Sequence, residues 1–506
     1  MAIHTFAAVD VGSYELGMKI FEISRTKGIR EIDHVVRRID LGSDTYASGK
    51  LSLRHVQEVR DVLREYKSIM DTYRVEAYQA YGTSAIREMT NASIILSQWE
   101  EETGIRVDVL SNSEQRFLDY KSLAYRGDTF DRMVDEGCAI VDIGGSSIQI
   151  SLFEGGSLKS TENMRLGVLR LRELIRSSDI RSSQASKAVQ EVVNSQISIF
   201  TELYPQARSL RNIVIVDDYI SALMESRGIE IIEVKKLVEM LRRATDRSVA
   251  DLAQEYRITD DNLALLAVSG ALMMSIIQAF GSEIIYAPGI TLADGIVYEY
   301  AERHRLLPAS HDFEEDILSC ARAIAARYHG SESRGNSLEI ISTRIFDATK
   351  KIHGLGKRER LLMRLACILH DCGKFVSISN AAECAYNIIM NTEIIGLSHI
   401  EREIVANVVY YNHTEFVYFE EQEEATDLSR AAYLTLTKLS AILRLANALD
   451  RTHRGKFDDL RVTVRDEKLM LNVKTGVDLT LERGLFRERA DFFSEVFGIT
   501  PVIRQK

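Results

Sequence analysis

The sequence predicts an α/β protein with two related lobes, each a mixed sheet flanked by helices, followed by a helical domain and a small α+β subdomain. A strand, a turn with Asp and Gly or Ser, and a second strand occur near residue 10 and again near residue 142, and helical and strand-like segments alternate after each copy. Helical spacing of apolar residues then runs from residue 313 to about 455. We expect four parts, at residues 1–130, 131–305, 313–455 and 456–506.

The first lobe begins with an apolar run that ends at Asp10. Leu16, Met18 and Ile20 then alternate with other side chains, which predicts a half-buried strand after the turn. Further along we expect strands at 4–11, 15–24, 30–41, 75–81 and 105–110, and helices at 52–73, at 91–103 and from Ser113 onward.

The second lobe repeats this plan, with Ile148, Ile150 and Leu152 alternating after the second turn. An uncharged segment at 263–280 just reaches the length of a membrane span, but its polar residues favour a buried helix. The other expected elements are helices at 167–177 and 184–203, a strand at 212–216, a linker at 304–312, strands at 460–465 and 469–473, a helix at 480–497 and a terminal strand.

Composition excludes several classes of function. The chain of 506 residues is 45% hydrophobic and 27% charged, as in ordinary globular proteins. Its net charge of −11 argues against general binding to nucleic acid or to an anionic membrane. The five scattered cysteines form no CxxC pair, and the first expected strand leaves no room for a leader, so we expect a cytoplasmic protein.

The repeated turn has the chemistry of a phosphate site. Glycines let the backbone approach a ligand closely, and successive amides bind anions. An Asp beside such a turn suits a metal ion that bridges phosphate oxygens. The first copy contains Asp10, Gly12 and Ser13, and the second contains Asp142, Gly144, Gly145, Ser146 and Ser147. This duplication resembles the superfamily of acetate and sugar kinases, heat-shock 70 proteins and actin, which implies duplicated ribonuclease H-like lobes.

Two further segments are candidates for the same site. Thr83, Ser84 and Arg87 follow a strand and would place hydroxyls and a guanidinium near a helix N-terminus, where anions bind. The alternative is an ordinary N-cap with a surface arginine. Glu114 stands at the start of a helix, and taken alone it is more typical of a capping residue than of a catalytic base.

The order of these four segments resembles the exopolyphosphatase/guanosine pentaphosphate phosphohydrolase (Ppx/GppA) family over residues 4–300. The resemblance implies hydrolysis of the terminal phosphoanhydride of polyphosphate or guanosine pentaphosphate, with Glu114 as the general base that activates water. It also implies a homodimer. Asp10 and Asp142 would hold Mg²⁺, and Asp142 would in addition be a catalytic residue. The implied phosphate contacts are Gly12, Ser13, Thr83, Ser84, Arg87, Gly144, Gly145, Ser146 and Ser147.

Departures from the family pattern keep other functions open. Tyr14 replaces an Asn of the first loop, Gln149 replaces a Glu of the second, and Ala293 replaces an Arg. The loss of charged groups leaves a weakly active or inactive sensor of polyphosphate or alarmone as the alternative. A kinase of small molecules is a third candidate, although residues 216–219 offer no Gly-rich loop for a nucleoside.

The helical domain resembles an HD domain through His370 and Asp371. Comparison with the family places Arg334 where a first His ligand belongs and Asn447 where a later Asp belongs. Two ligands make a poor metal site. We therefore expect a degenerate site, in which His370 and Asp371 form hydrogen bonds inside a helical scaffold.

Overall fold

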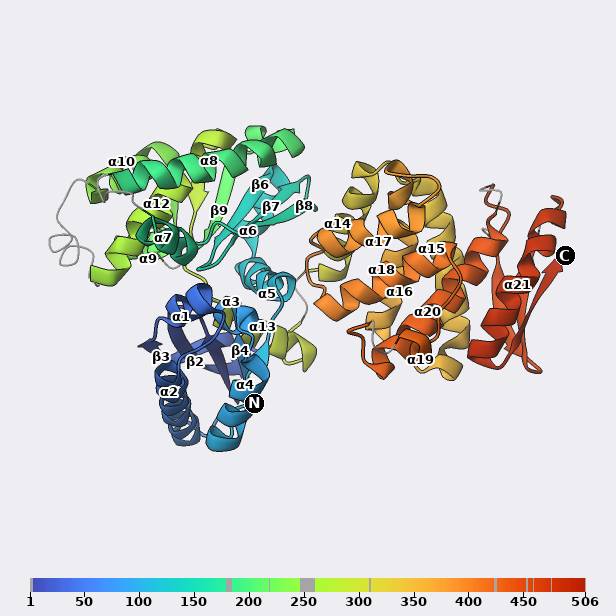
Figure 1. Cartoon of the computed structure of the whole chain (residues 1–506), viewed down its shortest axis with the longest axis horizontal. Coiled ribbons are helices and arrows are strands. Elements are labelled where there is room, and N and C mark those ends of the chain that lie inside the picture. Colours follow the sequence, from blue (N-terminus) through green and yellow to red (C-terminus); the bar gives the residue numbers. More distant parts are fainter. Residues whose placement is uncertain are drawn as a thin grey trace. The chain divides into compact units, whose positions relative to one another are not determined.

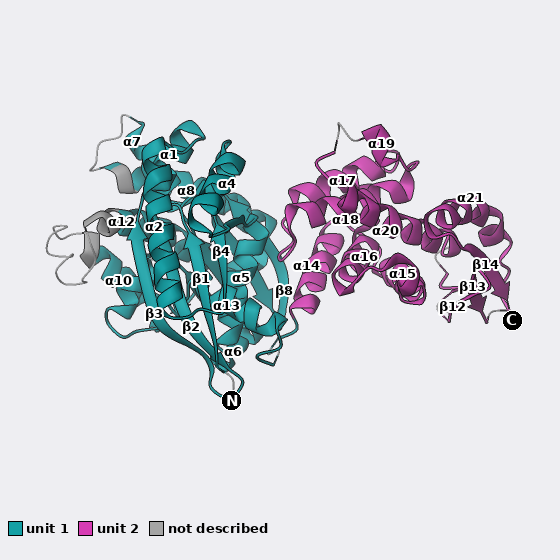
Figure 2. Ribbon diagram, turned by 90° about the horizontal axis from the view of Figure 1, so that it is seen from below, with its two compact units in different colours: residues 1–312 teal, residues 313–506 magenta. Residues whose placement is uncertain are grey.

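A computed structural model describes residues 3–178, 184–217, 219–245, 260–308, 311–422, 426–451, 454–457, 459–474 and 476–505. The chain divides into two compact units, residues 1–312 and 313–506 (Figure 2). Unit 1 contains two sheets with helices on their faces, and unit 2 contains a helical part followed by a small three-stranded sheet (Figure 1).

The first sheet of unit 1 has the strand order β3-β2-β1-β4-β5. Its first three strands are antiparallel neighbours, and β4 and β5 add in parallel to β1. The strands are β1 (His4–Val11), β2 (Glu15–Ser24), β3 (Gly28–Arg38), β4 (Ala77–Gly82) and β5 (Asp108–Val109). Because β1 and β4 run in parallel, their carboxyl ends meet at one edge of the sheet, where the first turn and Thr83 lie.

Alternating side chains of β1 serve two cores. Val9 and Val11 belong to a cluster with residues of α2 (Leu53–Thr72) and α4 (Ala92–Thr103) on one face. Phe6 and Ala8 belong to a cluster with α5 (Asn112–Tyr125) and α13 (Leu292–Arg303) on the other face. The helix α13 thus packs on the first sheet although it ends the second repeat.

The second sheet has the order β10-β11-β9-β6-β7-β8. Its strands are β6 (Cys138–Ile143), β7 (Ile148–Glu154), β8 (Ser157–Met164), β9 (Asn212–Val216), β10 (Ile231–Glu233) and β11 (Ile284–Tyr286). Around it lie α6 (Asp128–Glu136), α7 (Val168–Arg176), α8 (Ala185–Leu203), the 3-10 turn η2 (Pro205–Ser209), α9 (Tyr219–Glu225), α10 (Val234–Thr245) and α12 (Asp260–Phe280). The two hairpins β1–β2 and β6–β7 are the predicted repeat.

Most expected elements are confirmed, and the differences have local causes. The strand expected at 30–41 ends at Arg38, because the Asp40 side chain accepts from Ser43 N (3.1 Å) and starts the helix α1 (Leu41–Ser48). The uncharged segment lies in α12, where Leu272 and Ile276 are completely buried in the core of the second lobe. Among the described residues, no helix is long and apolar enough to cross a membrane.

Unit 2 begins with a helical part: α14 (Phe313–Arg327), α15 (Glu332–His353), α16 (Lys357–Leu369), the 3-10 turn η3 (Cys372–Phe375), α17 (Ala381–Asn391), α18 (His399–His413), α19 (Phe419–Gln422) and α20 (Arg430–Leu449). The strands β12 (Arg461–Arg465), β13 (Lys468–Val473) and β14 (Thr500–Gln505) follow, with α21 (Thr480–Phe497) between the last two. The parallel pair β13–β14 requires such a crossover helix.

Candidate active site

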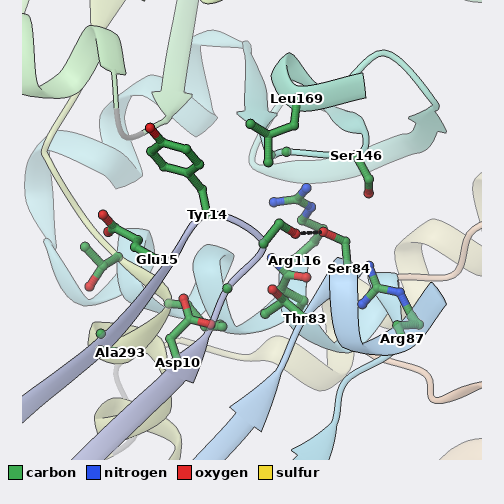
Figure 3. Close-up of a pocket in the computed structure, with 18 of the residues that line it drawn as sticks. Asp10, Tyr14, Glu15, Thr83, Ser84, Arg87, Arg116, Ser146, Leu169 and Ala293 are labelled. Carbon is green, nitrogen blue, oxygen red and sulfur yellow. Dashed lines mark hydrogen bonds between the residues drawn. The ribbon is translucent and has the colours of Figure 1, made fainter. Parts of the chain in front are cut away.

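The two hairpin turns and the segment after β4 converge on one cavity of unit 1 (Figure 3). Its volume is about 150 Å³, well above the roughly 10–15 Å³ that one water molecule needs. Of the residues that the sequence singled out, those on the cavity wall are Asp10, Gly12, Ser13, Thr83, Ser84, Arg87, Gly144, Gly145 and Ser146. The structure therefore brings together nine of the twelve predicted site residues, and their roles stay predictions.

Both turns are closed by the same backbone hydrogen bond. Gly12 N donates to Glu15 O, and Gly144 N donates to Ser147 O, each over 3.0 Å. A Cβ atom on Gly12 would lie 2.7 Å from Glu15 O, so the first turn admits only glycine. At the second turn a Cβ atom on Gly144 would lie 3.3 Å from Ser147 O and 2.8 Å from Arg116 Nη2, so glycine is favoured there as well.

A cluster of hydroxyl groups ties the first turn to the segment after β4. Ser13 Oγ lies 2.6 Å from Ser84 Oγ, and Tyr46 Oη lies within 3.0 Å of both. Ala85 N donates to Ser13 Oγ (3.2 Å). Burial raises the pKa of Tyr46, so its hydroxyl keeps its proton at neutral pH. The cluster holds Ser13 and Ser84 at fixed positions on the cavity wall.

Arg87 occupies a defined position at the edge of the cavity. It lies on the short helix α3 (Ser84–Glu88). Its Nη1 donates to Leu110 O (2.6 Å) and its Nη2 to Asn112 Oδ1 (2.5 Å). These contacts orient the planar guanidinium group, whose fork suits phosphate oxygens.

Glu114 forms the capping box of α5 and is not one of the residues that line the cavity. Its Oε2 accepts from Ser111 N (3.0 Å), while Glu114 N donates to Ser111 Oγ (3.2 Å). These two hydrogen bonds are those expected of a capping residue. The role of Glu114 as general base remains a prediction. The next two residues of the helix, Gln115 and Arg116, do line the cavity.

Asp142 is buried beneath the second turn, where Arg116 Nη1 donates to its Oδ1. Asp119 Oδ2 lies 3.7 Å from the same Arg116 nitrogen. Burial, followed by the nearby charge of Asp142, raises the pKa of Asp119 well above its usual range. Ser147 is also buried, and neither it nor Asp142 lines the cavity.

The second turn fits a directly bound Mg²⁺ poorly. Among the described residues, no group of three or more His, Cys, Asp and Glu side chains could hold a metal ion. Asp142 Oδ2 and Gln149 Oε1 are buried oxygens without a hydrogen-bond partner in the described part of the chain, but the other oxygen of Asp142 is already bound by a guanidinium group. Only Asp10, of the two predicted ligands, lines the cavity.

Comparisons with known proteins identify the family of this chain. The sequence profile of the Ppx/GppA phosphatase family matches residues 20–304. This chain belongs to the Ppx/GppA phosphatase family. The profile of the family's domain III matches residues 319–489. Family membership confirms the prediction that the chain is a hydrolase, because the family is one of phosphatases. The resemblance of the helical part to an HD domain stays a prediction.

Relatives of known name resemble this Ppx/GppA chain over most of its length. A guanosine-5'-triphosphate,3'-diphosphate pyrophosphatase of Photobacterium profundum is 21% identical over 473 residues, which cover 92% of this chain and 91% of the relative. An exopolyphosphatase from Cytophaga hutchinsonii has a TM-score of 0.51 at 14% identity and covers 60% of this chain and 100% of its own. The Aquifex aeolicus family member has a TM-score of 0.50 at 19% identity, over 60% and 99%. These structures confirm the predicted fold class.

Two residues of the cavity wall, Arg116 and Lys19, were not predicted from the sequence. Arg116 lies two positions after Glu114 and far from Asp142 in the sequence, so only the fold reveals the contact between Arg116 and Asp142. Lys19 also lines the cavity, and its Nζ lies 3.1 Å from Asp294 Oδ2 on α13 and 3.0 Å from Glu31 Oε2. The sequence carries no clear signal for Lys19, because the same strand also contains the charged residues Glu15 and Glu22.

The residues of the expected HD site also converge, inside unit 2. Arg334 Nη1 donates to both oxygens of Asp371 (3.0 Å each), and Arg334 Nη2 donates to Asn447 Oδ1 (3.0 Å). His370 Nε2 lies 3.0 Å from Asp371 Oδ2, and Lys374 Nζ lies 2.5 Å from Asp371 Oδ1. The guanidinium group of Arg334 thus lies among the residues of the expected degenerate HD site. These contacts confirm the expected hydrogen-bonded scaffold.

The pKa values of this cluster follow from its contacts. Burial alone would raise the pKa of Asp371, but the hydrogen bonds from His370 and Lys374 and the charge of Arg334 lower it far below its usual range. For His370, burial acts in the opposite direction and lowers the pKa, because the charged form of an imidazole is the protonated one. Asp371 is therefore ionised, and its charge is matched by the neighbouring cations.

Gly167→Ala should deform the second turn. An added Cβ would lie 2.3 Å from both Gly145 O and Ser147 N, atoms of the loop backbone that cannot move aside independently. We expect a loss of about 1–3 kcal/mol in the free energy of unfolding, with weaker binding of tripolyphosphate. Thermal unfolding and calorimetry measure both. Gly484→Ala is the control, since its Cβ meets nothing within 4 Å; equal effects of the two changes would contradict the argument.

Proposed function

We propose that this chain hydrolyses the terminal phosphoanhydride of guanosine pentaphosphate or of inorganic polyphosphate. One observation carries the proposal: the two hairpin turns with Asp10 and Gly144 and the Thr83–Arg87 segment line a single cavity. The names of relatives support the substrate class, because the Photobacterium profundum relative is a guanosine-5'-triphosphate,3'-diphosphate pyrophosphatase and the Cytophaga hutchinsonii structure is an exopolyphosphatase.

The proposed mechanism relies on position and charge more than on covalent chemistry. Backbone amides of the two turns and the guanidinium of Arg87 hold the terminal phosphate. Glu114 accepts a proton from a water molecule, whose oxygen attacks the phosphorus atom in line. The P–O bond to the shortened chain breaks, and the leaving phosphate carries the electron pair away. Asp10 is the residue that would hold Mg²⁺, and the ion would neutralise phosphate charge there.

Phosphate release by the purified full-length chain tests this function. We expect release from guanosine pentaphosphate or from polyphosphate, followed by a colorimetric phosphate assay and by chromatography of the products. No release from either substrate, with and without Mg²⁺, would contradict the proposal. Transfer of phosphate from ATP to a small acceptor would indicate a kinase. Light scattering of the same preparation tests the proposed homodimer.

A second candidate function is a sensor that binds these ligands and hydrolyses them slowly. Two observations favour it: the neutral Gln149 lies opposite Asp142 on the neighbouring strand, and Asp142 is paired with Arg116. Calorimetry distinguishes the two functions. Tight binding of guanosine pentaphosphate without turnover would favour the sensor, whereas rapid turnover would exclude it.

A further inference from the structure

Arg116 is a cationic residue that lies beside the second turn and lines the cavity, whereas Arg170, which donates to Ser146 O (3.1 Å), is not one of the lining residues. Arg116 extends from the first turns of α5 and lies in Figure 3 at the centre of the pocket near Ser84 and Ser146. Only 7% of the residue is exposed. A side chain this buried and this close to a phosphate-binding turn needs a chemical reason, because burying an isolated charge is costly.

Asp142 holds this guanidinium group in place. Arg116 Nη1 donates to Asp142 Oδ1, and both side chains are more than nine-tenths buried. The ion pair uses one end of the guanidinium fork. Nε of Arg116 is buried and has no hydrogen-bond partner in the described part of the chain. The group therefore retains donor capacity beyond the contact with Asp142.

Gly144 leaves room for the guanidinium at the turn itself. A Cβ atom on Gly144 would lie 2.8 Å from Arg116 Nη2. The absent side chain thus allows a cation to approach the loop from within the protein. A ligand oxygen bound by the amides of this turn would meet that cation.

The charges at the second loop do not call for a divalent metal ion. Arg116 already balances Asp142, and the cross-strand partner of Asp142 is the neutral Gln149. A metal ion at the other oxygen of Asp142 would lie beside the buried guanidinium bound to Oδ1, and repulsion between two cations in a buried site is unfavourable.

We propose that Arg116 binds the terminal phosphate of the substrate as the cation of the second loop, and that Asp142 positions Arg116 instead of holding a metal ion. The inference rests on the phosphate-chain substrate of the proposed function, but not on its hydrolysis. A planar guanidinium fork can bind two phosphate oxygens at once, which the point charge of lysine cannot.

Binding of inorganic tripolyphosphate tests this role without any need for turnover. Calorimetry in EDTA compares the wild-type chain with Arg116→Lys, which keeps the charge but loses the fork. We expect the dissociation constant to rise about 10- to 100-fold. Arg106→Lys is the matched control, because Arg106 is exposed, pairs with Asp108 and does not line the cavity; it should bind as the wild type does. Thermal unfolding checks that each variant is folded.

Asp142→Asn separates a positioning role from a metal-binding role. If Asp142 orients Arg116, this change weakens tripolyphosphate binding in EDTA, and its effect is not additive with that of Arg116→Lys. If Asp142 instead binds metal, the change weakens binding only when Mg²⁺ is present, and the inference is overturned. It is also overturned if wild type does not bind tripolyphosphate in EDTA, or if Arg116→Lys binds it normally. A chain that binds through Arg116 but releases no phosphate would contradict only the proposed hydrolysis.

Discussion

Glu114→Gln is expected to lower the rate of phosphate release by about 10²- to 10⁴-fold, the usual contribution of a general base. Glutamine cannot accept the proton of the attacking water. It can still accept the hydrogen bond from Ser111 N, because Gln serves at the third position of a capping box as Glu does. The proposed mechanism therefore predicts a loss of turnover, and the retained capping contact predicts no loss of stability. Steady-state kinetics and thermal unfolding measure the two effects.

Glu359→Gln is the control for this variant. Glu359 occupies the same position in the first turn of α16, where its Oε2 accepts from Gly356 N (2.7 Å). This change removes an equivalent charge outside the cavity and should leave turnover unaltered. If Glu114→Gln and Glu359→Gln both retain wild-type rates, Glu114 is a capping residue and another group activates the water.

Asp371→Ala is expected to lower the free energy of unfolding by about 3–5 kcal/mol, because it removes one partner of a buried ion pair and leaves the other uncompensated. Arg334, which is 6% exposed, would lose two hydrogen bonds, and Lys374 would lose its counter-ion. Denaturant unfolding followed by circular dichroism measures the change.

Asp347→Ala provides the comparison for this prediction. Asp347 also accepts two hydrogen bonds from one arginine, Arg360, at 2.9 and 3.0 Å, but its side chain is 53% exposed. An exposed pair of this kind contributes about 0–1 kcal/mol. Similar losses for the two variants would show that burial does not determine the strength of the Asp371 cluster.

Local features of the sequence were enough to predict the two hairpin turns. Each turn is closed by a hydrogen bond that spans only three residues, and in the first copy this close approach of Glu15 O leaves room only for glycine at position 12. The same holds for the start of α5, where Ser111 and Glu114 cap each other. Such interactions depend on neighbours in the chain, so their residue types and spacing identify them.

Family resemblance extended the prediction to contacts between distant residues in unit 2. Arg334 and Asn447 were assigned to the positions of two missing ligands, and they do meet, because Arg334 donates to Asn447 as well as to Asp371. Without that resemblance, nothing in the spacing of these residues indicates that they share a site. Conversely, the strand expected at 30–41 was too long, because apolar alternation does not reveal that Asp40 begins a helix.

The sequence by itself determined the duplicated lobes and the positions of the two turns, because short-range hydrogen bonds and side-chain periodicity set these features. Only the tertiary structure decided the partners of the buried charges. Arg116 comes to Asp142, Lys19 comes to Asp294 and α13 returns to the first sheet, because each buried group must find a counter-ion or an apolar surface wherever the packed chain offers one.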